Sequence, residues 1–348
     1  MEKQVVTKAM IMSAGVGSRL EPLTFTVPKP LIPIANKPVM DILLEKLRNI
    51  GITNVIANTY YLADKIIDRY KNNNLGINFN YIKEETLSGT AGGLKKCQSF
   101  FTKGDVFVVL SGDGLTNADI QKGIEKHLAS NAVATIGIKR IPHEEVSHFG
   151  VVVTDKNGFI KEFQEKPSVE KAKSNYINTG IYIFNYEIFD YIPENTFYDF
   201  AKNVFPELLK KCGINTFEIN EYWTDIGTIS QYKQSHKDLF EGLCEFQHAP
   251  IHEQNGGKYI SQSEIPSDTE FRGVSTIGFN CKLGKNVVIQ NCIIWDNVEI
   301  ADNTVLKNCI IASNSRILSD INEQTIPANE IIEKDFFLDL KEPEKINA

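Results

Sequence analysis

The sequence contains few cysteines, no long apolar run and fewer basic than acidic residues. Six cysteines occur in 348 residues, and no two of them are spaced as Cys-x-x-Cys. Scattered thiols of this kind argue against a disulfide framework or a zinc site and favour reduced cysteines. No stretch approaches the roughly 18 consecutive apolar residues of a membrane-spanning helix, and the first residues lack the basic-then-apolar order of a signal peptide. We therefore expect a cytoplasmic protein.

The balance of charge limits the partners of the protein. With 37 Lys and Arg residues against 44 Asp and Glu residues, the formal net charge is −7, so nucleic acid is not an expected partner. An anionic small molecule would have to be bound by a few locally placed cations. The composition, 42% apolar and 23% charged, is typical of a globular protein, and the length allows two domains.

Up to about residue 245, short β-rich runs alternate with helical patterns. This alternation predicts an α/β domain whose mixed, mostly parallel sheet is covered by helices on both faces. The predicted strands are 9–13, 55–57, 77–82, 106–110, 132–138, 150–154 and 177–184. The predicted helices are 39–50, 63–71, 120–130, 201–212 and 229–240.

The stretch 14–30 has the features of a phosphate-binding loop. It follows the first predicted strand, and open α/β sheets bind ligands at the carboxyl ends of their strands. Gly15 and Gly17 allow the backbone to approach a ligand closely, while Arg19 and Lys29 add positive charge. The loop is not a dinucleotide fingerprint, because the third glycine is missing, and no Gly-Lys-Ser/Thr triplet of a Walker loop follows.

Two further stretches place polar groups beside predicted strands. Residues 84–94 contain three glycines and small hydroxyl residues, which predicts a loop before a helix, with amides that face a ligand or only cap the helix. Asp113 stands between two glycines directly after the strand 106–110. It could bind Mg²⁺ together with phosphate oxygens, or it could only form a turn through its own side chain.

The sequence beyond about residue 250 is repetitive. The segment 291–294, Asn-Cys-Ile-Ile, recurs at 308–311, a repeat of 17 residues (308 − 291). Hexapeptide periodicity predicts a short parallel β-helix of two to three coils. Stacked asparagines and cysteines would follow from the repeat itself, without a metal site. The residues that recur at six and are expected to line the interior are Val288, Ile294, Ile300, Leu306, Ala312 and Leu318.

Taken together, the motifs resemble those of the sugar-1-phosphate nucleotidylyltransferases, or nucleotide-sugar pyrophosphorylases. Every fixed position of the family signature G-x-G-[ST]-R-L-x-P-L-T-x-x-x-P-K-P is filled within 15–30. The family's F-x-E-K-P, N-x-G-x-Y and W-x-D-x-G-T motifs are matched at 163–167, 178–182 and 223–228. One departure occurs in the family's L-G-T-A-G segment, where Ser88 separates the leucine from the glycine. The resemblance extends over about 8–240 and the repeat tail.

The resemblance implies a fold and a set of ligand-binding residues. The fold is a Rossmann-like, GT-A-like nucleotidyltransferase domain followed by a short left-handed parallel β-helix. The residues that it assigns to nucleotide binding are Ala14, Gly15, Gly17, Ser18, Arg19, Glu84, Gly89, Thr90 and Gly112. The residues that it assigns to the sugar phosphate are Gly150, Glu165, Lys166, Asn178 and Thr179.

The resemblance also implies a reaction, in which a nucleoside triphosphate and a sugar 1-phosphate give an NDP-sugar and pyrophosphate. Asp113 and Asp225 are expected to bind Mg²⁺. Arg19 is assigned to the departing phosphates, Lys29 to charge developing at the α-phosphate, and Lys166 to the incoming phosphate. No protein nucleophile is needed, because the substrate phosphate is itself the attacking group.

The runs 149–155 and 222–227 resemble the mannose-1-phosphate guanylyltransferase branch, which includes cyanobacterial enzymes that form UDP-glucose. We expect UTP and glucose 1-phosphate as substrates, with GDP-mannose formation as the alternative. A glycosyltransferase, a β-helix acyltransferase and a non-catalytic nucleotide-sugar sensor are competing interpretations. The expected division is 1–245 for catalysis, 246–333 for the β-helix and 334–348 for a tail. A homo-oligomer is expected, because the family's repeat tail often assists subunit assembly.

Overall fold

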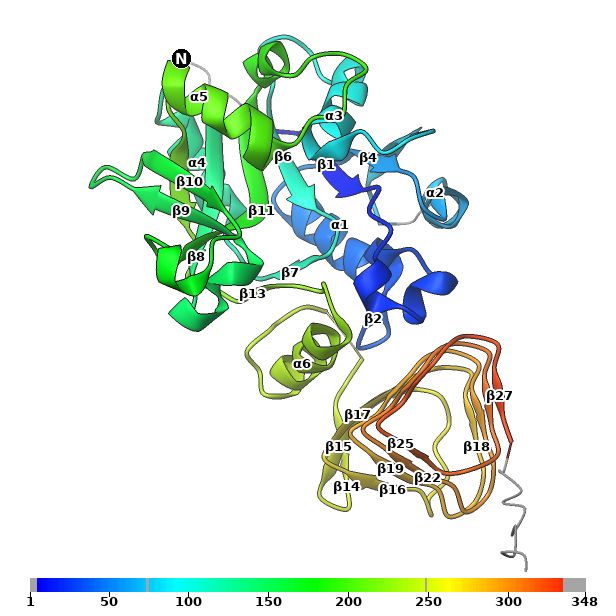
Figure 1. Ribbon diagram of the computed structural model, residues 1–348. Coiled ribbons are helices and arrows are strands. Elements are labelled where there is room, and N and C mark those ends of the chain that lie inside the picture. The colour runs from blue at the N-terminus through cyan, green and yellow to red at the C-terminus, as the bar shows by residue number, and fades with distance from the viewer. Residues whose placement is uncertain (1–4, 73–74, 248, 334–348) are drawn as a thin grey trace, which may run out of the picture. The chain divides into compact units, whose positions relative to one another are not determined.

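The computed structural model describes residues 5–72, 75–247 and 249–333 (Figure 1). The chain divides into two compact units, Met1–His248 and Ala249–Ala348. The predicted tail 334–348 lies outside the described residues. None of the helices in the described part of the chain has the length and apolar content that crossing a bilayer requires.

A mixed Rossmann-like sheet forms the centre of the first unit, which confirms the predicted fold class. Its strand order is β10-β9-β11-β6-β1-β4-β5, and β8 pairs with both β11 and β12. The half β6-β1-β4-β5 is parallel, whereas β11 runs antiparallel to β6, β8 and β9. The strands are β1 (Lys8–Ser13), β4 (Asn54–Thr59), β5 (Asn78–Lys83), β6 (Val106–Ser111), β8 (Ala134–Arg140), β9 (Gly150–Thr154), β10 (Ile160–Glu165), β11 (Tyr176–Asn185) and β12 (Asn215–Glu218).

Two small antiparallel pairs lie outside this sheet. They are β2 with β3 and β7 with β13. The second pair matters for the site. Strand β7 directly follows the turn after β6, and its pairing with β13 brings a segment more than a hundred positions later beside that turn. The bounds are β2 (Pro33–Ile34), β3 (Lys37–Pro38), β7 (Gly114–Thr116) and β13 (Trp223–Asp225).

The helices pack on the sheet through apolar faces. Helix α3 contacts β1 and β4, α4 contacts β8 and β12, and α5 contacts β10. Side chains of Asp119 and Thr228 accept hydrogen bonds from backbone amides at the starts of α4 and α6, of 3.0 Å and 3.2 Å. The helices are α1 (Val39–Asn49), α2 (Ala63–Tyr70), α3 (Gly89–Lys96), α4 (Ile120–Leu128), α5 (Phe205–Lys211) and α6 (Ile229–Phe240), with short 3-10 turns η1 (Ser18–Leu20), η2 (Leu23–Phe25), η3 (Lys29–Leu31), η4 (Gln98–Phe100), η5 (His143–His148), η6 (Val169–Lys171) and η7 (Tyr186–Tyr191).

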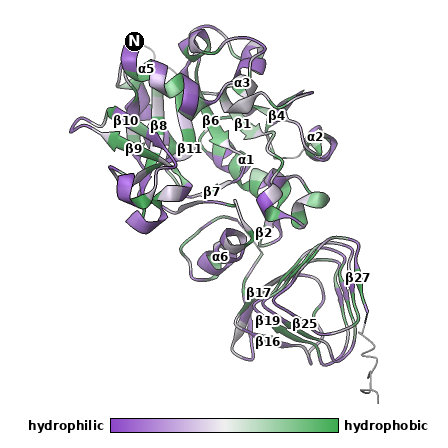
Figure 2. Cartoon of the chain, in the orientation of Figure 1, coloured by the Kyte–Doolittle hydropathy of each residue, from purple (hydrophilic) through white to green (hydrophobic). Residues whose placement is uncertain are grey.

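Aromatic side chains form much of the core of this unit. Phe107 on β6 stacks on Phe101 at 4.0 Å between ring centroids, and Phe184 on β11 packs against Phe200. Figure 2 shows apolar residues on the central strands and on the inward side of the helices. Burial on both faces explains why β6 reads as an uninterrupted apolar run in the sequence.

The prediction that 84–94 is a loop was wrong in its second half, because α3 begins at Gly89. Glycine lowers helix propensity by about 1 kcal/mol, so the glycines hide the helix from pattern analysis. Their role is close packing. A β-carbon added at Gly92 would lie 2.9 Å from the Thr196 carbonyl oxygen, and one added at Gly93 would lie 2.5 Å from Asn58 Nδ2.

The predicted helix 201–212 is also modified. A π-helical turn, η8 (Phe200–Val204), precedes α5. The carboxylate of Asp199 accepts hydrogen bonds from the amides of Ala201 and Lys202, at 2.9 Å and 3.2 Å. Pro206, which has no N–H group, stands in the first turn of α5. A proline there interrupts the regular pattern of helical hydrogen bonds.

The second unit is a parallel β-helix, as predicted. Its strands stack into three parallel ladders, β15-β17-β20-β23-β26, β16-β19-β22-β25 and β18-β21-β24-β27, and β14 adds antiparallel to β15. The first ladder therefore has five strands and the other two have four each, more than the two to three coils expected. The strands are β14 (His252–Gln254), β15 (Gly257–Gln262), β16 (Glu270–Arg272), β17 (Val274–Phe279), β18 (Lys282–Leu283), β19 (Val288–Gln290), β20 (Ile293–Ile294), β21 (Glu299–Ile300), β22 (Val305–Lys307), β23 (Ile310–Ile311), β24 (Arg316–Ile317), β25 (Ile321–Asn322), β26 (Thr325–Ile326) and β27 (Ile331–Ile332).

The prediction of the interior residues of the β-helix was wrong at two positions. Ile289 and Ile317 are fully buried in its core, whereas their neighbours Val288 and Leu318 are only half-buried. Strand partners are 17 residues apart on the first three rungs, as in Ile277, Ile294 and Ile311. A 17-residue coil contains two six-residue steps and one five-residue step, so a strict six-residue count moves out of register.

Asparagines at the corners of the β-helix stack as the repeat predicts. Asn280, Asn297 and Asn314 all have positive φ, of 55°, 58° and 63°, a conformation that asparagine tolerates better than most residues. Each side-chain amide donates to the asparagine one rung further along, at 3.0 Å and 3.1 Å. Cys292 and Cys309 stack similarly inside, with 3.3 Å between their sulfur atoms.

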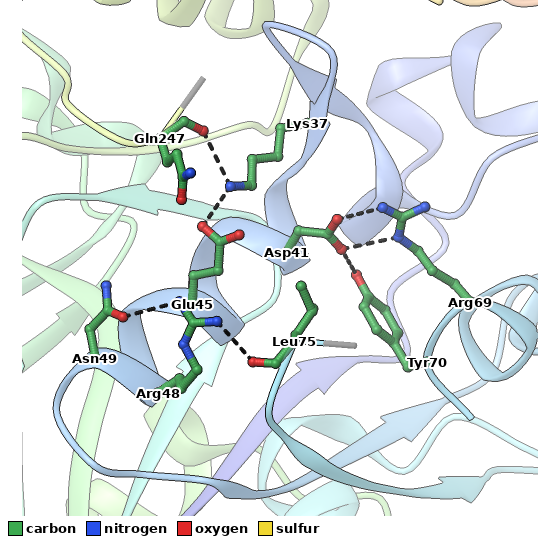
Figure 3. A network of polar contacts seen from close by, with 9 residues as sticks. All are labelled: Lys37, Asp41, Glu45, Arg48, Asn49, Arg69, Tyr70, Leu75 and Gln247. Carbon is green, nitrogen blue, oxygen red and sulfur yellow. Dashed lines mark hydrogen bonds and ion pairs between the residues drawn. The ribbon is translucent and has the colours of Figure 1, made fainter. Parts of the chain in front are cut away.

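A polar network holds α1 and the β2–β3 hairpin in place (Figure 3). The buried carboxylate of Asp41 accepts hydrogen bonds from Arg69 Nε at 3.0 Å and from the hydroxyl of Tyr70 at 2.5 Å. Burial, followed by the charge of Asp41, raises the pKa of Tyr70. Lys37 donates to Glu45 at 2.5 Å and to the Gln247 carbonyl oxygen at 3.2 Å. This network braces the segment that directly follows the loop 14–30.

Candidate active site

A cavity of about 370 Å³ lies at the carboxyl ends of β1, β4 and β6. This is the edge at which parallel α/β sheets bind ligands. The cavity brings together stretches that are far apart in the sequence. The residues with predicted roles that line it are Ala14, Gly15, Lys29, Glu84, Gly89, Thr90, Gly112 and Asp113.

The loop after β1 folds back on itself at Gly17. This glycine has φ of 76°, and a β-carbon there would lie 3.0 Å from Thr24 Cγ2 and 3.2 Å from Lys29 Cβ. The Thr24 hydroxyl donates to the Gly17 carbonyl oxygen at 3.1 Å. Only glycine fits this close approach without strain. The fold-back leaves Ser18 and Arg19 exposed and Lys29 largely shielded, with 14% of its side chain exposed.

Lys29 forms an ion pair with Asp113. The hydroxyl of Ser111 donates to the other carboxylate oxygen of Asp113 at 2.5 Å. Burial by itself would raise the pKa of Asp113, but Lys29 and the hydrogen bond from Ser111 outweigh it and hold the pKa below its ordinary value. Asp113 is therefore a carboxylate, not a neutral acid, at neutral pH.

The β7–β13 pair places Asp225 beside Asp113. Asp225 lies opposite Gly114 in the ladder, and the amide of Ile226 donates to the Asp113 carbonyl oxygen at 3.0 Å. Burial raises the pKa of Asp225, and the negative charge of Asp113 adds to this effect. Gln231 Nε2 donates to Asp225 Oδ1 at 2.7 Å and so fixes the orientation of the carboxylate.

Arg19 lies close to the carboxylate of Asp225. A β-carbon at Gly227 would lie 3.0 Å from Asp225 Oδ2 and 3.4 Å from Arg19 Nη2. The positive charges of Lys29 and Arg19 both act to lower the pKa of Asp225, although burial and Asp113 dominate. Four of the five charged residues with predicted catalytic roles therefore lie together at one edge of the sheet, namely Arg19, Lys29, Asp113 and Asp225.

Glu84 is a buried carboxylate in the lining of the cavity. Its side chain is 1% exposed, and its carboxylate accepts hydrogen bonds from Asn58 Nδ2 at 2.7 Å and from the Ser88 hydroxyl at 2.6 Å. Asn58 Oδ1 in turn accepts from the amide of Ser13 at 3.1 Å. Because these bonds occupy both oxygens of Glu84, the residue holds the two ligand-facing loops together, in addition to any contact with the base.

A segment around Tyr198 closes one wall of the cavity. The Tyr198 carbonyl oxygen accepts from the amides of Ala91 and Gly92, both at 3.0 Å. The Thr90 hydroxyl donates to Asp199 Oδ2 at 3.0 Å. Phe197, 68% exposed, also lines the cavity. An exposed aromatic ring in the lining of the cavity is well placed for contact with a ligand.

The predicted sugar-phosphate residues lie on neighbouring strands. Gly150 on β9 pairs with Glu165 on β10, and a β-carbon at Gly150 would lie 3.4 Å from Glu165 Oε2. Lys166 is exposed and has φ of 46°. Asn178 Nδ2 donates to the Tyr182 hydroxyl at 3.0 Å. The Thr179 hydroxyl donates to the Gly137 carbonyl oxygen at 2.7 Å, so this side chain faces the protein.

Two contacts connect these strands to the acidic pair. The indole N–H of Trp223, on β13, donates to the Thr179 carbonyl oxygen at 3.0 Å. A β-carbon at Gly180 would lie 3.0 Å from Ser111 Cβ. The amino-terminal part of β11 is therefore adjacent to the turn that carries Asp113.

Sequence analysis missed several residues of this site. Ser111 is the last residue of the buried strand β6, and Asn58 is the last but one of β4. A polar residue at the carboxyl end of a buried strand is the same signal that identified Asp113. Gln231 could have been suggested by its helical spacing from Thr228. Phe197 has no local signal, because only the folding of its segment against α3 brings it to the cavity.

The donor set fits a divalent cation that is shared with phosphate. No group of three or more His, Cys, Asp and Glu residues able to hold a metal exists within the residues that the structure describes. Asp113 and Asp225 supply two carboxylates, and burial together with the negative charge of Asp113 raises the pKa of Asp225. Mg²⁺ is typically bound by one or two carboxylates, with phosphate oxygens and water completing its coordination.

Comparison with known proteins defines the class. The profile of the Nucleotidyl transferase family matches residues 8–242, and that of the GMPPB C-terminal domain matches residues 259–338. The chain therefore belongs to the Nucleotidyl transferase family. Its relatives are sugar-phosphate nucleotidyltransferases, and the chain is an enzyme of this class. Enzymes of the family generally use a divalent metal ion.

Individual relatives share most of the chain. It is 38% identical over 322 residues to the UTP–glucose-1-phosphate uridylyltransferase of Synechocystis sp., covering 83% of each protein. It is 34% identical over 241 residues to the mannose-1-phosphate guanylyltransferase catalytic subunit beta of Drosophila melanogaster, covering 68% of this chain and 62% of that protein. A solved UDP-glucose pyrophosphorylase from Acinetobacter baumanii has a TM-score of 0.61 at 18% identity, over 67% of this chain and 92% of that one, a likeness in fold.

Proposed function

We propose that the protein forms UDP-glucose and pyrophosphate from UTP and glucose 1-phosphate. An oxygen of the sugar phosphate attacks the α-phosphorus of the nucleotide, the bond between the α-phosphorus and the bridging oxygen breaks, and pyrophosphate leaves. The observation that carries the proposal is the convergence of Lys29, Asp113, Asp225 and Arg19 at the edge of one cavity. Two anions must meet for this reaction, so neutralisation and alignment of charge are the main tasks of the protein.

The loop after β1 and the start of α3 would bind the nucleotide. Gly15 has open space in front of it, since no atom lies within 4 Å of a β-carbon built there. Phosphate oxygens can therefore approach the backbone of this loop. Arg19, exposed at the rim, would bind the β- and γ-phosphates that leave as pyrophosphate. Gly89 and Thr90 also line the cavity, and the base would lie against them.

The acidic pair and Lys29 would act at the α-phosphate. Mg²⁺ held by Asp113 and Asp225 would supply positive charge between the nucleotide and the sugar phosphate. Lys29 exchanges its partner, the carboxylate of Asp113, for the developing charge on the α-phosphate. Gln231 and Ser111 keep the two carboxylates oriented throughout.

Strands β9, β10 and β11 would bind the sugar 1-phosphate. The carboxylate of Glu165 can accept hydrogen bonds from sugar hydroxyls, and the ring would lie against Gly150, which Phe163 and Glu165 surround. Lys166 would bind the phosphate. Because the Thr179 hydroxyl is bonded to Gly137, Thr179 would contribute through its backbone.

The choice of UTP and glucose 1-phosphate is supported by the Synechocystis relative, whose likeness covers 83% of each protein. A second candidate is formation of GDP-mannose. It is favoured by the match of residues 259–338 to the GMPPB C-terminal domain and by the Drosophila guanylyltransferase. A non-catalytic sensor is disfavoured, because the charged groups that the reaction requires are all present.

The test is a grid of five nucleoside triphosphates against the 1-phosphates of glucose, mannose and N-acetylglucosamine, with pyrophosphate release as the readout. We expect the highest kcat/KM for UTP with glucose 1-phosphate. A maximum at GTP with mannose 1-phosphate would replace the first candidate by the second. Absence of pyrophosphate release from every pair would refute the proposed reaction.

A further inference from the structure

A second cavity, of about 500 Å³, lies along α3 beyond the residues that line the first one. Its volume exceeds that of the first cavity, and no group with a predicted role in the reaction lines it. Ser88 lines both cavities. The side chains on which the following argument depends are Lys95, Lys96, Gln98, Ser99, Phe101 and Glu194.

The polar groups of the second cavity suit an anion that also carries hydroxyl groups. The charged residues of its lining are Lys95, Lys96 and Glu194, two ammonium groups against one carboxylate. Lys95 donates to the Phe189 carbonyl oxygen at 3.1 Å. Each ammonium has three N–H donors, so a phosphate can also be bound. Gln98, which donates to a tyrosine hydroxyl at 3.0 Å, together with serine and threonine groups of the lining, offers partners for hydroxyl groups.

Lys96 connects the second cavity to the first. Its ammonium lies 3.4 Å from Glu84 Oε2 and 3.4 Å from the Thr86 carbonyl oxygen. Glu84 is the buried carboxylate that holds Asn58 and Ser88 beneath the first cavity. A buried carboxylate is costly without a cation beside it. An anion that attracts Lys96 therefore weakens the support of the nucleotide-binding loops.

A shared segment provides a second connection. Residues 193–196 line the second cavity, whereas Phe197 and Asp199 line the first. In the same segment, the amide of Tyr198 donates to the carbonyl oxygen of Ser88, a residue that lines both cavities, at 2.8 Å. A ligand that displaces 193–196 therefore also moves residues 197–199, which form part of the wall of the first cavity.

We propose that the second cavity binds a small phosphorylated metabolite that carries hydroxyl groups, and that its binding lowers the affinity of the first cavity for nucleotide. The binding itself does not depend on the reaction proposed above. The coupling rests on the part of the proposed function in which the nucleotide occupies the first cavity.

Binding is tested by titration calorimetry of the full-length chain with glycerol 3-phosphate, inorganic phosphate and glycerol. A Lys166→Ala background weakens binding at the proposed sugar-phosphate site. We expect glycerol 3-phosphate to bind one site and to bind more tightly than either fragment. Equal affinity for inorganic phosphate would overturn the assignment to a hydroxylated metabolite, and absence of binding would overturn the site.

Two variants of different kinds locate the site. Lys95→Gln removes a charge and keeps a donor for the Phe189 carbonyl oxygen, while Ser99→Trp fills the cavity from an exposed position. Both should abolish binding without a change in melting temperature. Lys103→Gln, which removes an equal charge from an exposed residue outside the lining, should bind normally. Normal binding by both cavity variants would refute the location.

Coupling is tested by the Kd of UTP with and without saturating glycerol 3-phosphate. We expect the Kd of UTP to rise about fivefold, the lower end of common allosteric coupling, and to be unaffected in Lys95→Gln. An unchanged Kd in the parent protein would overturn the coupling. Failure of the proposed reaction would instead appear as absence of pyrophosphate release, with the calorimetric results unaffected.

Discussion

Lys29 and Asp113, 84 positions apart in the sequence, form an ion pair at the carboxyl edge of the sheet. Their side chains are 14% and 19% exposed, so the pair is largely shielded from solvent. The lysine assigned to the α-phosphate is thus held by the carboxylate assigned to the cation. In the proposed reaction, a phosphate and a cation that arrive together would give each group a new partner of the required sign, without leaving either charge uncompensated.

Replacement of Arg19 tests the assignment of the leaving phosphates. Arg19→Ala should lower kcat by about two orders of magnitude, since stabilisation of developing charge is commonly worth ~3 kcal/mol per donor. Steady-state assays of pyrophosphate release measure the effect. Arg19→Lys should recover part of the rate, because it keeps the charge but loses the planar fork. Near-normal turnover of Arg19→Ala would exclude it from the mechanism.

Replacement of Lys166 separates the two substrates. Lys166→Ala should raise the KM for the sugar 1-phosphate at least tenfold while the Kd of the nucleotide stays within about twofold, because the exposed ammonium lies beyond the nucleotide cavity. Lys161→Ala, at an exposed position on β10, the strand that ends just before Lys166, is the matched control. Equal losses of nucleotide and sugar-phosphate binding would contradict the role given to Lys166.

The parts of the site that follow from local sequence were predictable. The loop with Gly17 and Lys29 has a fixed spacing, and Asp113 directly follows an apolar run. The proximity of Asp113 and Asp225 cannot be predicted from the local sequence, since it depends on the pairing of β7 with β13. A resemblance to a family suggested it, and only the fold brings the two residues together.

The errors in the fold prediction have physical causes. Helix α3 was hidden because tertiary packing against Asn58 and Thr196 requires glycines that disfavour a helix in isolation. The interior of the β-helix was misplaced at Val288 and Leu318, since one side of each coil has five residues instead of six. In both cases long-range packing determined the outcome, and a periodic pattern does not reveal it.

Two glycine variants distinguish a packing role from a ligand-binding role. Gly93→Ala places a β-carbon 2.5 Å from Asn58 Nδ2, so overpacking of 1–3 kcal/mol should exceed the gain of about 1 kcal/mol in helix propensity. Gly15→Ala meets no atom within 4 Å and should leave stability unchanged but weaken nucleotide binding. Urea unfolding and calorimetry with UTP measure the two effects. Tight UTP binding by Gly15→Ala would contradict the phosphate-loop assignment.

Gln231 is expected to act through Asp225. Loss of the 2.7 Å hydrogen bond in Gln231→Ala should weaken Mn²⁺ binding in the presence of nucleotide about tenfold, the lower end for residues that orient a metal ligand. Electron paramagnetic resonance of free Mn²⁺ measures this without turnover. Gln234→Ala, one turn further along α6 and bonded to Asp238 at 2.7 Å, should bind Mn²⁺ normally. Similar behaviour of the two variants would remove Gln231 from the site.

His236 should make stability depend on pH. Burial lowers its pKa from 6.5 to about 4, and its Nε2 accepts from the amide of Ala35 at 3.2 Å, in the segment that follows Lys29. The folded state therefore favours the neutral ring. The contribution to stability is complete above pH 6.5, the unfolded value, and is lost as pH falls toward 4.

Between pH 7 and pH 5 this residue should remove about 2 kcal/mol from the free energy of unfolding. Urea denaturation at the two pH values measures the loss. His236→Gln, which keeps an acceptor for Ala35 but does not titrate, should lose about 2 kcal/mol less over the same interval. His252→Gln, at an exposed position, should behave as the parent. An identical pH dependence in His236→Gln and the parent would show that the ring is protonated alike in the folded and the unfolded chain. It would contradict the interpretation that a buried, neutral His236 connects α6 to the segment that follows Lys29.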